Sequence, residues 1–144
     1  IAQQLPKTTN EWPKKTVLLQ GYASIMPLLG YRNYNAGVEF TKHKEQLHLG
    51  LRMGLSFGGY LEDSPTDLTY LAAPHLAGVF YWGNRKWHPE LTAGGVVFLG
   101  DEADVLYWPI LNVGVRYDSP SQPIVFRAAF GTGGFGVGLG IRLF

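Results

Sequence analysis

The chain has 144 residues, of which 46% are hydrophobic, 14% are aromatic and 16% are charged, with a formal net charge of +1. This length predicts one domain, and the near-neutral charge gives no basis for nucleic-acid binding. The absence of cysteine excludes disulfides, thiol catalysis and cysteine zinc sites. The sequence contains no run of about 18 apolar residues, so no transmembrane helix is predicted. A membrane-spanning barrel strand, however, needs only about 9–11 residues.

Residues 1–14 are polar and contain two prolines, so they are predicted to form a flexible tail that precedes a barrel domain at 15–144. This opening does not look like a signal peptide, which is expected of a mature form. Alternating side chains predict strands at about 16–29, 35–42, 47–59, 68–82, 89–99, 105–117, 123–131 and 134–144. Short connections separate these strands, and Pro27, Pro74 and Pro109 are expected at bulges or strand ends. The sequence therefore predicts an all-β fold, an eight-stranded antiparallel up-and-down β-barrel.

The segment 47–59 indicates which side of the wall faces outward. One parity is large and apolar throughout, whereas the other alternates glycine with His48, Arg52 and Ser56. Solvated strand faces seldom carry repeated glycine, so we expect the apolar side to face lipid and the polar side to fill a narrow lumen. The charged residues expected to interlock in the lumen are Glu39, Arg52, Glu90, Arg116, Arg127 and Arg142. A packed ionic plug is favoured over a pore, and a soluble, lipocalin-like ligand-binding barrel is the alternative fold.

The connections of an up-and-down barrel alternate between its two ends. An acidic outer rim is predicted from Glu62, Asp63, Asp67, Asp101, Glu102 and Asp104. Basic residues and the tail collect at the other end, so a tail in the periplasm would place the acidic rim outside the cell. Solvated charge is the default interpretation of this rim, and cation-bridged lipopolysaccharide is the alternative. Interfacial aromatic residues are expected at both ends, namely Trp82, Trp87, Tyr107 and Trp108.

Several stretches of the chain carry a resemblance to a known family. They are NVGVRYDSPSQPIVFRAAFG, the glycine-alternating strand that ends in Phe144, and the segments GVEFTK, LHLGLRMG and KWHPELTAGG. Over about residues 30–144 the chain resembles small, functionally uncharacterised outer-membrane β-barrel proteins of Gram-negative bacteria. The resemblance implies location in the outer membrane and insertion by the barrel-assembly machinery, which reads a terminal aromatic residue. Phe144 departs from this pattern because Ile141 and Leu143 carry the apolar parity. The resemblance brings no reaction and no cofactor.

Functional candidates are weighed against ordinary barrel packing. His48 and His75 could meet Ser24 and Ser56 in the lumen, which would suit a lipid acyl hydrolase or acyltransferase. Hydrogen bonding that fills the lumen is favoured, and no role is expected for His43 or His88. The predicted function is therefore a non-catalytic accessory subunit, without cofactor or metal, that contacts lipid, lipopolysaccharide and another outer-membrane protein. The surface expected to meet that protein is a smooth patch of Gly21, Ala23, Ala93 and Gly95.

Overall fold

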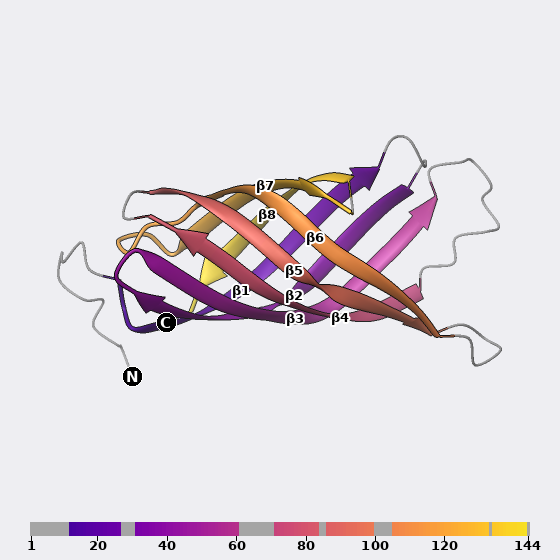
Figure 1. The fold of residues 1–144 in the computed structure, drawn as a ribbon, viewed down its shortest axis with the longest axis horizontal. Coiled ribbons are helices and arrows are strands. Elements are labelled where there is room, and N and C mark those ends of the chain that lie inside the picture. The colour runs from indigo at the N-terminus through magenta and orange to yellow at the C-terminus, as the bar shows by residue number, and fades with distance from the viewer. Residues whose placement is uncertain are drawn as a thin grey trace.

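Eight antiparallel strands close into a barrel in which every strand pairs with its neighbours in sequence (Figure 1). The computed structural model describes residues 12–26, 31–60, 71–83, 86–99, 105–132 and 134–143. The strands are β1 (Lys15–Met26), β2 (Tyr31–Lys44), β3 (Leu47–Tyr60), β4 (Leu71–Trp82), β5 (Trp87–Leu99), β6 (Val105–Tyr117), β7 (Ile124–Gly131) and β8 (Gly134–Arg142). The predicted all-β fold with eight antiparallel strands is thus confirmed. Within the described ranges, no helix is long and apolar enough to cross a membrane.

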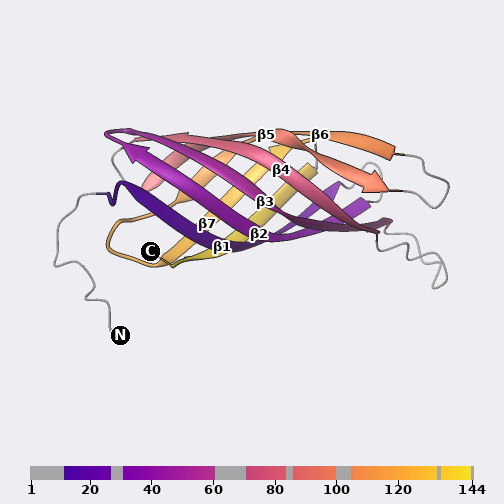
Figure 2. The same cartoon turned by 90° about the horizontal axis from the view of Figure 1, so that it is seen from below.

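Pairing of the first and last strands closes the ring. Leu18 of β1 lies opposite Arg142 of β8, and this ladder continues to Ile25 opposite Phe135. The strands run obliquely across the long axis of the barrel (Figure 2). Because β1 begins and β8 ends at the same end of the barrel, we call this end the tail end. The closed ring gives every strand two paired neighbours, although β6 before Asn112 is paired only with β5.

Each strand forms one hydrogen-bonded ladder with each of its two neighbours. Pro74 and Pro109 lie just outside one of these two ladders. Pro74 precedes the first β4–β5 pair, His75 with Val96, and Pro109 precedes the first β6–β7 pair at Asn112. Each proline is paired on its other side without a break in register, to Leu55 and Gly95 respectively. Of the two expected positions, a bulge or a strand end, the unbroken register excludes a bulge for these two prolines, and each lies just before the start of one ladder. Their missing N–H groups fall where only one neighbour is hydrogen-bonded. Pro27 lies outside the described residues.

The two faces of the wall differ as the alternation of β3 requires. Leu49, Leu51 and Leu55 are 49%, 45% and 45% exposed, whereas Arg52 is 6% exposed and Ser56 is fully buried. The same outward apolar parity occurs on all eight strands. Examples, from β1 to β8, are Leu19, Phe40, Leu51, Leu76, Leu91, Val113, Phe126 and Leu139. The apolar side chains thus form a continuous belt around the outside of the barrel, and the polar side chains lie inside.

Two glycines allow β2 and β3 to approach each other closely. Gly37 and Gly54 are directly opposite in register. A Cβ added to Gly54 would meet the backbone carbonyl of Ala36 and the Cα of Gly37, and a Cβ on Gly37 would meet the carbonyl of Met53. Any side chain at either position would therefore force the two strands apart.

Candidate functional site in the charged interior

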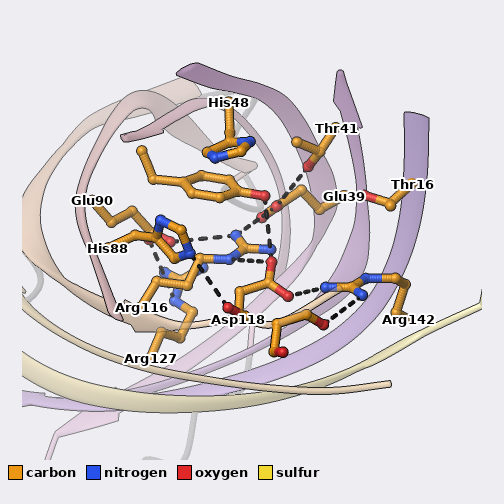
Figure 3. A network of polar contacts seen from close by, with 12 residues as sticks. Thr16, Glu39, Thr41, His48, His88, Glu90, Arg116, Asp118, Arg127 and Arg142 are labelled. Carbon is orange, nitrogen blue, oxygen red and sulfur yellow. Dashed lines mark hydrogen bonds and ion pairs between the residues drawn. The ribbon is translucent and has the colours of Figure 1, made fainter. Parts of the chain in front are cut away.

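Glu39 is the centre of a charged network inside the barrel (Figure 3). Arg52, its direct cross-strand partner, donates to Oε2 from Nε at 3.1 Å and from Nη2 at 2.7 Å. Arg116 crosses the interior from β6 and donates from Nη1 to Oε1 at 2.7 Å. Thr41 donates to the same Oε1 at 3.0 Å. Because Glu39 is fully buried, these four hydrogen bonds replace the water that its carboxylate loses on folding.

Glu90 of β5 joins two further arginines to this centre. Its Oε2 lies 3.4 Å from Nη1 of Arg116, and its Oε1 lies 3.6 Å from Nη2 of Arg52 and 3.7 Å from Nε of Arg127. Thr92 donates to Glu90 at 3.2 Å. Glu39 and Glu90 thus hold arginines from β3, β6 and β7, which links opposite parts of the wall.

Asp118 extends the network toward the tail end, and sequence reasoning missed it. It is 1% exposed, accepts from Nε of Arg116 at 3.2 Å and from the hydroxyl of Tyr81 at 3.4 Å, and pairs with Nη2 of Arg142. Arg142 also donates to the carbonyl of Ser119 at 2.8 Å. The sequence places Asp118 in a turn, DSPSQP, but it shares the parity of Arg116, which is the signal that could have identified it.

Arg127 is the least compensated of the interior arginines. Within the described residues the interior contains four arginines (Arg52, Arg116, Arg127 and Arg142) but only three carboxylates (Glu39, Glu90 and Asp118). Nη1 of Arg127 donates to Gln20 at 3.2 Å and its guanidinium lies 4.6 Å from the centre of the Tyr22 ring, but its Nε has no hydrogen-bond partner. The amide nitrogen of Gln20 is also without a partner.

A cluster of histidines and aromatic rings lies at the tail end of the interior. Hydrogen bonds connect Thr16 Oγ1 to His43 Nε2 at 2.9 Å, His43 Nδ1 to His48 Nδ1 at 2.7 Å, and His48 Nε2 to the carbonyl of Gly83 at 3.2 Å. Because the Gly83 carbonyl can only accept, His48 donates to it from Nε2. One consistent assignment then has His43 donating from Nδ1 to Nδ1 of His48 and Thr16 donating to Nε2 of His43, with both imidazoles neutral. Tyr81 stacks on His48 with ring centres 4.6 Å apart.

Residue 12, which sequence analysis assigned to the tail, lies against this cluster. The Trp12 ring stacks on His43 at 4.8 Å and contacts His88 at 5.6 Å, and the guanidinium of Arg142 lies 5.2 Å from its centre. Residues 1–11 lie outside the described residues. His43 and His88, for which no role was expected, are both buried here, so their position beside turns was a poor guide.

Ser56 and His75 lie together in the other half of the interior. The Oγ of Ser56 is 3.1 Å from Nδ1 of His75, and Ser56 donates a hydrogen bond to the Oδ1 of Asn35. Ser24 is also buried, but His48 belongs to the tail-end cluster. Of the predicted serine and histidine candidates, only Ser56 and His75 are hydrogen-bonded to each other in the described residues.

Trp82, Trp87 and Tyr107 are exposed on the outside near strand ends, as predicted for girdle aromatics. Trp108 is exposed as well, but it shares the inward parity of Arg116 and lies opposite the buried Val96, so its assignment to the outer girdle was wrong. Trp82 ends β4 and Trp87 begins β5 at the tail end, where the Trp87 ring lies 5.1 Å from that of Tyr117. Tyr107 and Trp108 lie on the part of β6 that is farthest from the tail end. The six acidic residues of the predicted outer rim (Glu62, Asp63, Asp67, Asp101, Glu102 and Asp104) lie outside the described residues.

The predicted smooth patch is divided between opposite walls. Gly21 and Ala23 belong to β1 and Ala93 and Gly95 belong to β5, and three strands separate β1 from β5 in either direction around the ring. The Tyr107 ring also occupies the space where a Gly95 side chain would extend, and its hydroxyl donates to the Gly94 carbonyl at 3.2 Å. The prediction of one patch was therefore wrong, because it took no account of strand order.

Searches against protein-family models, curated proteins and solved structures found no match for this chain. Within the described ranges, no group of histidine, aspartate or glutamate side chains has a geometry that could hold a metal ion.

Proposed function

We propose that this chain is an integral outer-membrane β-barrel with a lumen filled by its own side chains, and that it serves as a non-catalytic accessory subunit of a larger outer-membrane complex. The observation that carries the membrane assignment is the apolar belt on all eight strands. Soluble proteins rarely expose contiguous apolar patches larger than a few hundred Å². A closed barrel also satisfies its backbone groups internally, as a bilayer requires.

The height of the belt supports the same proposal. On β2, Arg32 and Lys42 have outward parity, and the outward residues between them are Tyr34, Ala36, Val38 and Phe40. About ten residues at roughly 3.3 Å each, tilted by about 40°, span roughly 25 Å, which is the usual height of the apolar band of an outer-membrane barrel. The exposed aromatics Trp87 and Tyr107, near opposite ends, fit the interfacial girdles of such proteins.

The interior network supports a filled lumen. The buried charges of Glu39, Arg52 and Arg116 are held in direct ion pairs, and a ring of eight strands is only wide enough for side chains. A soluble ligand carrier would need the opposite arrangement, with an apolar interior and a polar outside. An open pore would need these arginines to be hydrated rather than paired across the interior.

Insertion can be tested by adding the unfolded chain to phospholipid vesicles and floating them on a density gradient. The proposal predicts that the chain floats with the vesicles, resists extraction by alkaline carbonate and acquires β-structure. A chain that folds in buffer without lipid or detergent and stays in the dense fractions would contradict the membrane assignment.

The accessory role rests on how little of the chain extends beyond the wall. The connections at the end opposite the tail comprise only residues 27–30, 61–70, 100–104 and 132–133. Long outer loops, which commonly bind substrates and receptors, are not available at that end, so we expect a partner to meet the wall itself. Gly78 and Ala93 are exposed neighbours on β4 and β5, and small outward residues allow close approach.

Purification from native membranes in mild detergent tests this role. The proposal predicts a stoichiometric protein companion, which Gly78→Leu and Ala93→Leu should each weaken, whereas Gly21→Leu on the opposite wall should not. A clean monomer obtained under the mildest extraction would contradict the accessory role.

The hydrogen bond between Ser56 and His75 supports a second candidate, a lipid-modifying acyl hydrolase or acyltransferase. It ranks lower because the Ser56 hydroxyl donates its hydrogen bond to Oδ1 of Asn35 rather than to His75, and because Ser56 is fully buried inside the barrel. An acyl-turnover assay with lipopolysaccharide and phospholipid substrates distinguishes the two candidates. Turnover that Ser56→Ala abolishes in a folded barrel would establish the enzyme and contradict the non-catalytic role.

A further inference from the structure

Three lysines form an exposed patch on the outside of the barrel at the tail end. Lys15 of β1 and Lys42 of β2 are directly opposite in register, and Lys44 follows two residues after Lys42 on the same face. Like charges directly opposite on neighbouring strands are destabilising. Lys15 and Lys42 thus carry a cost that an anionic neighbour would remove.

The chain supplies little negative charge to this patch within its described residues. Glu39, Glu90 and Asp118 are buried and paired with arginines inside the barrel. The other described carboxylate, Glu45 in the turn between β2 and β3, is exposed, so one exposed carboxylate stands against the three lysines. None of the ion pairs found in the described part of the chain involves the patch.

The patch lies at the depth where lipid headgroups would be found. Phe40, two residues from Lys42 on the same face, is 48% exposed and belongs to the apolar belt. Lysine can extend its apolar stem along the belt while its ammonium group reaches the interface. Trp82 and Trp87 are exposed at the same end, where indole rings usually sit at the level of headgroups.

We propose that Lys15, Lys42 and Lys44 bind the phosphate groups of anionic phospholipids of the phosphatidylglycerol type, in the leaflet at the tail end. This inference rests on the proposed function, because it requires the barrel to span a bilayer. Phospholipid is chosen over lipopolysaccharide because the longest connection, 61–70, lies at the other end, whereas the tail-end connections are 45–46, 83–86 and 118–123. The shorter turns of outer-membrane barrels face the periplasm, where the leaflet is phospholipid. Each lysine near an anionic surface adds attraction, which salt weakens.

Tryptophan quenching by brominated lipid chains tests the proposal. The variant Trp108→Phe keeps only Trp12, Trp82 and Trp87, all at the tail end. It is placed in vesicles that mix phosphatidylcholine and phosphatidylglycerol, with one or the other brominated. We expect an apparent affinity for phosphatidylglycerol about threefold or more above that for phosphatidylcholine.

Two further variants in the same background assign this preference to the patch. Lys15→Gln combined with Lys42→Gln should bring the preference close to one, whereas Arg32→Gln at the opposite end should leave it unchanged. Raising the salt concentration should reduce the preference of the parent. Unchanged resistance to thermal unfolding verifies that each variant is folded.

The outcomes separate this inference from the function it rests on. Equal quenching by the two brominated lipids, or a full preference in the Lys15/Lys42 double variant, would overturn the lysine proposal while still showing that the barrel contacts lipid. No quenching by either lipid would overturn the membrane assignment and the lysine proposal with it.

Discussion

The outer wall and the interior of this barrel are made by alternate residues of the same strands, yet their contacts predict that they tolerate change differently. Phe40 and Glu39 are adjacent in β2, but Phe40 faces outward whereas Glu39 is held by Arg52 and Arg116. In the proposed bilayer, the outward position requires only that a side chain be apolar, because any apolar group suits hydrocarbon. The inward position requires one charge in one place, because removing it leaves its partners buried without compensation.

The largest effect is expected from removal of the central carboxylate. Glu39→Gln leaves Arg52 and Arg116 undercompensated and should lower the free energy of unfolding by about 3–5 kcal/mol. The adjacent outward substitution, Phe40→Leu, should cost less than about 1.5 kcal/mol. Urea unfolding of the lipid-inserted chain measures both variants. A loss for Glu39→Gln no larger than that for Phe40→Leu would show that the interior pairs are not what distinguishes the two faces.

A charge placed on the outer wall should have a cost that depends on depth. Met53 is opposite Val38, near the middle of the stretch from Arg32 to Lys42, whereas Leu47 begins β3 at the tail end. Met53→Lys should lower the free energy of unfolding from vesicles by about 2–4 kcal/mol and Leu47→Lys by about 0–1 kcal/mol. Equal costs at the two positions would mean that no hydrocarbon layer surrounds the middle of the barrel.

Alanine substitutions at an inward and an outward glycine should differ in stability by less than the two preceding pairs of variants. Gly54→Ala should destabilise by about 1–3 kcal/mol, because its new methyl group would meet the backbone of β2. For Gly21, on the outer face of β1, the nearest atom to an added Cβ is the carbonyl oxygen of Asn35 at 3.8 Å. Gly21→Ala should therefore be neutral or slightly stabilising. Equilibrium unfolding of the two variants compares them, and equal destabilisation would exclude close approach of β2 and β3 as the cause.

The smallest effect on stability is expected at the tail end. Trp12→Ala removes the ring stacked on His43 and should cost about 0.5–1.5 kcal/mol. It should also raise the rate at which diethylpyrocarbonate modifies His43, whereas Trp108→Ala, far from the tail end, should not. An unchanged modification rate would mean that Trp12 does not shield this cluster.

Sequence reasoning predicted the outer wall better than the interior for a physical reason. Outward residues need only share a parity and a polarity, so β6 was predicted at 105–117, the range observed for Val105–Tyr117. Interior pairing depends on how the ring closes. Arg116 and Glu39 are 77 residues apart and meet because the barrel brings β6 across from β2. Patterns along one strand do not contain that information.

The remaining errors have the same origin. Asp118 was assigned to a turn because its neighbours are turn residues, although its carboxylate points back to Arg116. The small patch failed because β1 and β5 lie across the ring from each other. Trp12 was assigned to a tail because local composition does not reveal a ring that stacks on His43.

The central claim is that the apolar side of every strand touches hydrocarbon while the arginine-bearing side is enclosed. Irradiation of the vesicle-inserted chain with an apolar diazirine dissolved in the bilayer, followed by residue-level mass spectrometry, tests it directly. Adducts are expected on Leu49, Leu51 and Leu55 of β3 and none on Arg52 or Ser56. Adducts that favour the Arg52 parity, or an absence of adducts along β3, would contradict it.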